Sequence, residues 1–156
     1  MNSTYVIRPA VESDVLGLES LDKHSNPHPW GRTLVADALE VRLNWVMCEA
    51  QNPNTIVAWL TASRCVDQSE LELVLVDSNV RRQGIAKQLV QHWLDSLNKQ
   101  GVAEFLLEVR ESNLAAIYLY EALGFELVGR RKQYYQTETG RESACLYTLV
   151  SPVGRG

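Results

Sequence analysis

The chain has 156 residues, of which 46% are hydrophobic, and its formal net charge is −4. This length and apolar content predict one domain large enough to bury a core, and the acidic balance excludes the global positive field typical of proteins that bind DNA or RNA. The three cysteines are widely spaced and include no CxxC pair. That spacing argues against a disulfide framework or a zinc site and favours a cytoplasmic protein with reduced thiols. No apolar run approaches the roughly 18 residues that span a membrane, so we expect no membrane partner. Residues 1–4 lead directly into a strand-like segment, so we expect no signal peptide.

The first half of the chain predicts one strand, two helices and three further strands. Pro9 stops the first strand, and apolar residues at helical spacing follow Ser13 or Asp14, either of which can cap a helix. Two prolines predict a turn over residues 24–31. The expected elements are a strand at 5–8, helices from Val15 and at 33–42, and strands at 45–48, 55–65 and 70–76.

The second half predicts two helices, each followed by strands. The first helix starts after Gly84 and runs to Lys99, with Gly101 as a common residue after a helix end. Ser112 is the expected N-cap of the second, which ends at Leu123. The expected strands lie at 105–109, from 125 to 128 and at 144–150, with a polar hairpin region before the last one.

This order, β-α-α-β-β-β-α-β-α-β-β, predicts an α/β domain in which helices flank a mixed central β-sheet. We expect the domain to span residues 1–150 and residues 151–156 to form a flexible C-terminal tail.

The turn between the strand from Glu70 and the next helix has the chemistry of an anion site. The first N–H groups of a helix have no intrahelical partners, and the helix dipole adds partial positive charge there. Gly84 lets a phosphate approach the backbone without a Cβ in the way, and Arg81, Arg82 and Lys87 add full charges. The pattern is neither a Walker loop nor a dinucleotide fingerprint, and a charged strand-to-helix turn without a ligand is the competing interpretation.

The spacing Arg81-x-x-Gly84-x-Ala86 resembles the (Gln/Arg)-x-x-Gly-x-(Gly/Ala) pyrophosphate loop of the GNAT superfamily of N-acetyltransferases. Two further runs are similar to the bacterial ribosomal-protein alanine N-acetyltransferases of the RimI type: LEVRESNLAAIYLYEALGF at 107–125 and GRRKQYYQTETGRESA at 129–144. The likeness covers about residues 5 to 150 and includes a Pro-Trp before Gly31. Ser143 stands where that group usually has Asp, and Gly31-Arg32 where it usually has Ser-Glu, so the departures concern the segments near the protein substrate.

The resemblance implies a GNAT fold with acetyl-CoA as cosubstrate and no metal. It implies direct attack of a free amine on the thioester, with the N-terminal alanine of the eighteenth small-subunit ribosomal protein as substrate and no nucleic-acid contact. The strand backbone would hold the acetyl and pantetheine groups, and the loop would hold the pyrophosphate. The implied cofactor-binding residues are Val74, Leu75, Val76, Arg81, Arg82, Gln83, Gly84, Ile85, Ala86 and Asn113.

Glu108 is an ionisable group inside an otherwise apolar strand, on the same face as Leu106 and Arg110. An N-terminal ammonium has a pKa of about 8, so acetyl transfer needs an acceptor for its proton and an acid for the departing thiolate. A strand-end Glu paired with Arg110 is the competing interpretation. The resemblance implies that Glu108 is the general base.

Tyr120 follows Asn113 by seven residues, or two helical turns, which predicts that both side chains point to one face. Packing in an apolar stripe with Ala116, Leu119 and Leu123 is the competing interpretation for Tyr120. The resemblance implies that Tyr120 is the general acid and that Asn113 binds the pantetheine arm.

Two other functions stay open from the sequence. One keeps the chemistry but acetylates a small-molecule amine or a lysine side chain; the Tyr134-Tyr135 segment argues against it, and Ser143 weakens that argument. The other is a non-catalytic acyl-CoA-binding module, against which the presence of both Glu108 and Tyr120 speaks. Trp30, Tyr134 and Tyr135, which we expect in loops, are candidates to line a peptide entrance, and exposed aromatic packing is the competing interpretation.

Overall fold

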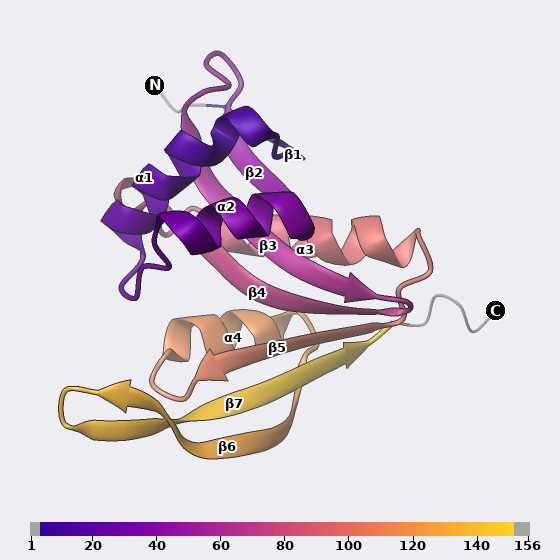
Figure 1. Cartoon of the computed structure of the whole chain (residues 1–156). Helices are drawn as coiled ribbons and strands as arrows, with labels where there is room; N and C mark the ends of the chain where they lie inside the picture. The colour runs from indigo at the N-terminus through magenta and orange to yellow at the C-terminus, as the bar shows by residue number, and fades with distance from the viewer. Residues whose placement is uncertain (1–3, 152–156) are drawn as a thin grey trace. The chain divides into compact units, whose positions relative to one another are not determined.

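The computed structural model describes residues 4–151, which form seven strands, four α-helices and two 3₁₀ turns (Figure 1). The strands hydrogen-bond in the order β1-β2-β3-β4-β5-β7-β6. The predicted order of helices and strands is confirmed, and so is the mixed sheet, because β4 and β5 are parallel whereas β5 and β7 are antiparallel. No helix among the described residues is long and apolar enough to cross a membrane.

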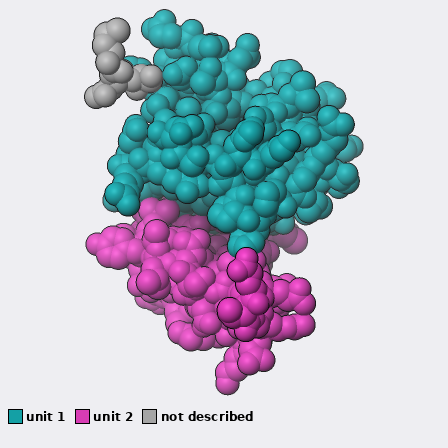
Figure 2. Space-filling model, turned by 90° about the vertical axis from the view of Figure 1, so that its left-hand side faces the viewer, with its two compact units in different colours: residues 1–64, 72–95 teal, residues 65–71, 96–156 magenta. Residues whose placement is uncertain are grey.

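The chain divides into two compact units (Figure 2). Unit 1 comprises residues 1–64 and 72–95, and unit 2 comprises residues 65–71 and 96–156. Two elements run through both units, the strand β4 (Gln68–Val76) and the helix α3 (Ile85–Asn98).

Unit 1 contains an antiparallel set of strands with helices on both faces. The helices α1 and α2 cover one face and α3 covers the other (Figure 1). The register of β1 with β2 pairs Tyr5 with Glu49, and a bulge interrupts the pairing of β2 with β3 after Met47. The elements are β1 (Tyr5–Pro9), α1 (Val15–Ser25), α2 (Arg32–Val41), β2 (Leu43–Glu49) and β3 (Ile56–Cys65).

The core of unit 1 lies between α1, α2 and the strands. Its helix members recur at helical spacing, so each helix presents one apolar face, and β2, β3 and β4 each contribute one buried residue. Trp30, half-buried, packs edge-on against Trp59 with ring centroids 5.8 Å apart, so its contact is with the core. The buried members are Leu18, Leu21, Val35, Ala38, Val46, Trp59 and Leu75.

Of the two residues predicted to cap α1, Asp14 stands at the N-cap position, but its side chain bonds elsewhere. The Asp14 carboxylate accepts the Val11 N–H at 2.8 Å and two N–H groups of Arg8 at 2.8 and 2.9 Å, and it makes no side-chain bond to the helix. The Arg8 hydrogen bond holds the pKa of Asp14 below its ordinary value. A nearby guanidinium therefore outcompetes the helix N–H groups for this carboxylate.

The turn predicted at residues 24–31 is shorter, because α1 continues to Ser25. The buried Asp22 holds the remaining turn in place. Its carboxylate accepts the N–H groups of Trp30 and Gly31 at 3.0 Å each, which ties the chain after α1 back onto the helix.

Unit 2 contains the first half of β4, then β5 (Glu104–Arg110), β7 (Gly140–Val150) and β6 (Glu126–Thr137), with α4 (Leu114–Ala122) between β5 and β6 in sequence. The predicted polar hairpin region is part of the antiparallel pair of β6 and β7, which extends beyond the apolar ends of both strands and is interrupted by two register shifts. The hydroxyl of Tyr147 donates to Glu121 of α4 at 2.9 Å, so α4 lies on the Tyr147 face of the strands.

Of the tail predicted at 151–156, residues 152–156 lie outside the described residues. Ser151 is buried, and its N–H donates to the carbonyl of Ala103 at 2.7 Å. Ser151 is therefore packed and is not part of a flexible tail.

Candidate active site

The loop after β4 is anchored to the C-terminal end of α1. The N–H of Ser78 donates to the Ser25 hydroxyl at 3.1 Å, and the Arg81 guanidinium donates to the Ser25 carbonyl at 2.7 Å. A cation at a helix C-terminus interacts favourably with the helix dipole. Arg81, predicted to add charge to an anion site, thus also fixes the path of the loop in unit 1.

The loop itself presents an open, exposed backbone. Arg82 and Gly84 have φ of 67° and 73°, in the left-handed region. A Cβ placed on Gly84 meets no atom within 4 Å. Arg82, Gln83 and Gly84 are all exposed. Open space over a backbone with positive φ suits the close approach of a ligand.

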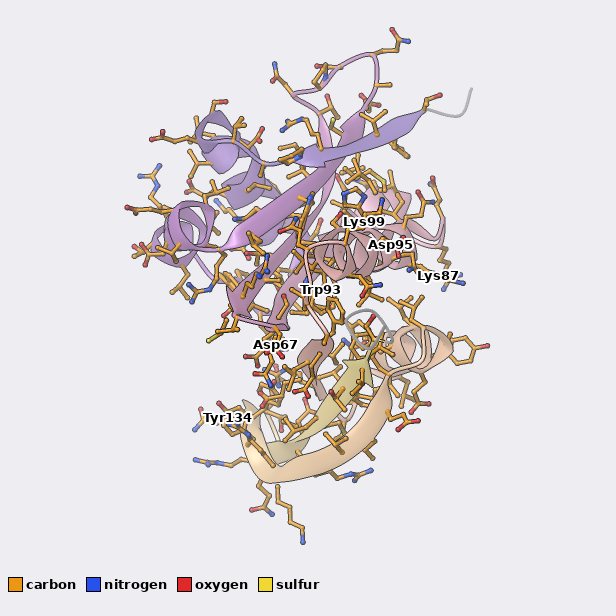
Figure 3. The ribbon with its side chains drawn as sticks, turned by 90° about the vertical axis from the view of Figure 1, so that its right-hand side faces the viewer. Asp67, Lys87, Trp93, Asp95, Lys99 and Tyr134 are labelled. Carbon is orange, nitrogen blue, oxygen red and sulfur yellow. The ribbon has the colours of Figure 1, made fainter. Side chains whose placement is uncertain are left out.

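The helix α3 begins at Ile85, and its first backbone hydrogen bond runs from the Gln88 N–H to the Gly84 carbonyl at 3.1 Å. The N–H groups of Ile85, Ala86 and Lys87 precede that bond, so they have no acceptor inside the helix. The side chain of Ile85 is buried and anchors the helix start, whereas Lys87 is exposed on α3 (Figure 3). This arrangement fits the anion site that the sequence predicts.

The three strand residues predicted to bind acetyl-CoA lie in the second half of β4, where buried and half-buried side chains alternate. Leu75 points into the core of unit 1, and Val74 and Val76 are half-buried. Their backbone contacts with acetyl-CoA stay a prediction.

Glu108 lies in unit 2, on the face of β5 opposite to the buried Phe105, Leu107 and Val109. Its side chain is 23% exposed. One carboxylate oxygen, Oε2, accepts the Tyr135 hydroxyl at 3.2 Å, and the other, Oε1, lies 3.3 Å from Arg131 Nε.

The expected alternative pairing of Glu108 with Arg110 is not the one the structure shows. Arg110 donates to Glu142 at 3.0 Å, and its guanidinium stacks 4.1 Å from the centroid of the Tyr135 ring. Two hydrogen bonds hold the pKa of Glu142 below its ordinary value: the larger effect comes from Ser112 and the smaller from Arg110. Glu142 therefore keeps its charge and holds Arg110 against Tyr135.

Tyr135 connects these groups. Burial, followed by the charge of Glu108, raises the pKa of Tyr135 to about 12. The phenol is therefore neutral at physiological pH and can donate its proton in a hydrogen bond to the carboxylate. Its ring also meets the ring of Tyr134 edge-on at 5.1 Å, and Tyr134 is half-exposed on the hairpin of β6 and β7 (Figure 3).

A register shift in the hairpin brings Tyr135 and Arg131 to Glu108. Arg131 pairs with Ala144 but Tyr135 pairs with Glu142, so extra residues of β6 bulge between them. Gln133, within the bulge, has φ of 52°, and its N–H donates to the Ser143 hydroxyl at 3.3 Å. Ser143, where the resembling family usually has Asp, thus supplies an acceptor for the bulge.

The start of α4 corrects one prediction. The N-cap is Asn113, not Ser112, and its side-chain oxygen accepts the Ala116 N–H at 3.2 Å. An amide oxygen at this position satisfies a helix N–H that would otherwise lack a partner. The proposed pantetheine contact of Asn113 would have to share the side chain with this cap.

Tyr120 is buried, and its ring meets Phe125 edge-on at 5.9 Å. Burial raises the pKa of Tyr120 above its ordinary value, so the hydroxyl keeps its proton. Tyr118, two residues earlier, is 79% exposed, so its side chain lies on a different face of α4 from Tyr120.

The sequence singled out Glu108 and, as a residue at a peptide entrance, Tyr135, but it did not connect them. Arg131 received no role at all. The hairpin bulge that unites the three has no residue signal beyond an unusual run of polar side chains. Among the described residues, no group of three or more His, Cys, Asp and Glu side chains is placed to hold a metal ion.

Comparisons with known proteins agree on one family. The model of the acetyltransferase (GNAT) family matches residues 15–125. The [ribosomal protein bS18]-alanine N-acetyltransferase of Escherichia coli strain K12 is 36% identical over 138 residues, which are 88% of this chain and 91% of that protein. The enzyme of the same description from Haemophilus ducreyi is 32% identical over 92% of this chain and 99% of that protein.

Solved structures agree with the predicted GNAT fold. The crystal structure of the ribosomal-protein-S18-alanine N-acetyltransferase from Escherichia coli has a TM-score of 0.90 at 32% identity and covers 98% of both chains. Arabidopsis thaliana NAA60 in complex with a bisubstrate analogue has a TM-score of 0.86 at 18% identity, over 97% of this chain and all of that one. The latter likeness concerns the fold alone.

Proposed function

Because this chain belongs to the acetyltransferase (GNAT) family, we propose that it transfers the acetyl group of acetyl-CoA to the N-terminal alanine of ribosomal protein bS18. The observation that supports this substrate is the 36% identity, over 88% of the chain, to the [ribosomal protein bS18]-alanine N-acetyltransferase of Escherichia coli. We assign the activity to one acetyltransferase domain over residues 1–150. The protein acts in the cytoplasm, where ribosomal proteins are made.

The cosubstrate is held by the loop and helix start of unit 1. Its pyrophosphate binds the N–H groups of Ile85, Ala86 and Lys87 and approaches the backbone at Gly84. The open space at Gly84 and the exposed Arg82 and Gln83 support this assignment. Arg81 acts mainly by fixing the loop through Ser25.

The chemistry is direct transfer. The free amine attacks the thioester carbonyl, the C–N bond forms and the C–S bond breaks. Glu108 accepts the proton that the ammonium loses and passes it to water. Tyr120 gives a proton to the departing thiolate, and the second proton, which the nitrogen releases as the amide forms, returns through water to Tyr120. The support for these roles is the half-buried carboxylate with a hydroxyl partner and the buried phenol, which is neutral at physiological pH.

A peptide competition tests the substrate. One peptide starts with Ala and carries basic residues in its first six positions; its partner is blocked at the N-terminus but keeps internal lysines. Mass spectrometry should place the acetyl group on the N-terminal alanine of the first. Acetylation of lysine or spermidine, with the Ala peptide inert, would overturn the substrate and leave the acetyl-CoA chemistry standing. Binding of coenzyme A without turnover on any amine would favour a non-catalytic module.

A further inference from the structure

We propose that Arg131 is a placeholder cation: it pairs with Glu108 while the acceptor site is empty, and the N-terminal ammonium of the substrate takes its place. This inference rests on the proposed function, because it concerns the carboxylate assigned as the base. It assigns a positioning role to Arg131 and no chemical step.

Both oxygens of Glu108 have a partner in the structure. Tyr135 donates to Oε2 at 3.2 Å, and Arg131 Nε lies 3.3 Å from Oε1. A substrate ammonium that reaches this carboxylate must therefore exchange with one of these two groups or share an oxygen with it.

Tyr135 is the fixed partner. The guanidinium of Arg110 lies against its ring, and Glu142 holds Arg110 at 3.0 Å, with both side chains of this pair mostly buried. Moving the Tyr135 hydroxyl would disturb a stack and an ion pair together.

Arg131 is the partner that can leave. Its side chain is 56% exposed, and an ion pair of such exposure contributes little to stability. It also has a second interaction partner. Its guanidinium lies 5.4 Å from the centroid of the Tyr134 ring, within cation–π range. When Arg131 leaves Glu108, its guanidinium therefore keeps the contact with Tyr134 and becomes better hydrated.

The exchange distinguishes substrate from product. The amine arrives as an ammonium, which competes with a guanidinium for the carboxylate. After transfer the same nitrogen belongs to a neutral amide, and once Glu108 has passed its proton to water, the carboxylate has no cation except Arg131. The return of Arg131 then opposes rebinding of substrate but not binding of product.

The test compares Arg131→Gln with Arg130→Gln. Arg130 is a matched control, since it is also 56% exposed and lies 3.9 Å from Glu111. In Arg131→Gln, the KM for the Ala-starting peptide should fall by roughly two- to five-fold, the range for a part-exposed ion pair. The inhibition constant of the acetylated peptide and kcat should stay unchanged. Arg130→Gln and Arg131→Lys should both keep the KM of the wild type.

A KM for Arg131→Gln that is unchanged or raised, with the melting temperature and kcat preserved, would overturn the placeholder role. So would an inhibition constant that falls by the same factor as KM, because Arg131 would then only obstruct the site. If Arg131→Gln fails to fold, Arg131→Met, which also removes the charge, takes its place: a lowered KM would support the role, and a KM equal to or above that of the wild type would overturn it. A wild-type protein that binds coenzyme A but acetylates no Ala-starting peptide would overturn the proposed function, and the role of Arg131 with it.

Discussion

Glu108 shows how little of a side chain's chemistry follows from its own identity. Its neighbours in sequence, Val109 and Arg110, contribute neither of its partners. Those come from β6, 23 and 27 residues further along the chain, as the positions of Arg131 and Tyr135 show. A carboxylate with a neutral phenol on one oxygen and a half-exposed cation on the other is held in place and yet accessible.

Replacement of Glu108 by Gln keeps the shape and the hydrogen bond from Tyr135 but removes the base. We expect kcat to fall by roughly 10²–10⁴-fold, while coenzyme A binds as in the wild type. Stopped-flow turnover and calorimetry measure the two quantities. Near wild-type turnover across pH 6–9 would leave Glu108 with a structural role only.

Replacement of Tyr120 by Phe removes the hydroxyl and retains the ring that packs against Phe125. We expect turnover to fall by roughly 10²–10⁴-fold, with little change in melting temperature. Tyr118→Phe is the matched control, because Tyr118 lies on the same helix and is exposed; its turnover should not change. Equal rates for both variants would assign Tyr120 to packing.

At the scale of elements, the loop between β4 and α3 is built by three separate constraints. Asp77 accepts the Asn79 N–H at 2.9 Å, Ser25 anchors Ser78 and Arg81, and the positive φ at Arg82 and Gly84 turns the backbone toward α3. A non-glycine residue with positive φ costs free energy, so the surrounding contacts must hold Arg82 in place.

Gly84→Ala tests the loop as a phosphate site. The added Cβ meets no protein atom, so the protein bears only the cost of positive φ, about 1 kcal/mol. We expect the dissociation constant for coenzyme A, measured by calorimetry, to rise at least several-fold. Gly101→Ala is the matched control: Gly101 has φ of 91° and open space as well, but it follows the other end of α3. Equal affinity in both variants would remove the phosphate from this loop.

At the scale of the whole molecule, three tyrosines of unit 2 are shielded from solvent. Tyr120 and Tyr147 are buried and Tyr135 is half-buried. Burial is the main cause that raises the pKa of each. A group whose pKa is higher in the folded state stabilises the fold below its unfolded pKa, near 10 for Tyr, and this contribution is lost as pH rises further.

The free energy of unfolding should therefore fall between pH 9 and pH 11. In Tyr120→Phe one titrating group is missing, so the fall should be about 1.4 kcal/mol smaller than in the wild type. The free energy of unfolding of Tyr118→Phe should fall by as much as that of the wild type. Urea unfolding followed by circular dichroism at both pH values measures this, and an identical fall in all three proteins would contradict the burial of the Tyr120 hydroxyl.

The sequence by itself determined the order of helices and strands, the mixed α/β sheet, the family and the loop at Gly84. These features rest on local patterns: apolar periodicity sets each element, glycine permits a positive φ, and a run of residues with fixed spacing identifies the family. For the same reason most element boundaries were predicted to within a few residues.

Only the tertiary structure decided the partners of the charged side chains. Asp14 meets Arg8 instead of capping α1, Arg110 meets Glu142 instead of Glu108, and Arg81 meets Ser25. Each of these pairs joins two residues that are distant in sequence or lie on different elements. Strand register and helix placement therefore decide whether the two side chains meet. The bulge of β6 is the sharpest example, because a shift in pairing decides which side chains reach Glu108, and no local pattern encodes such a shift.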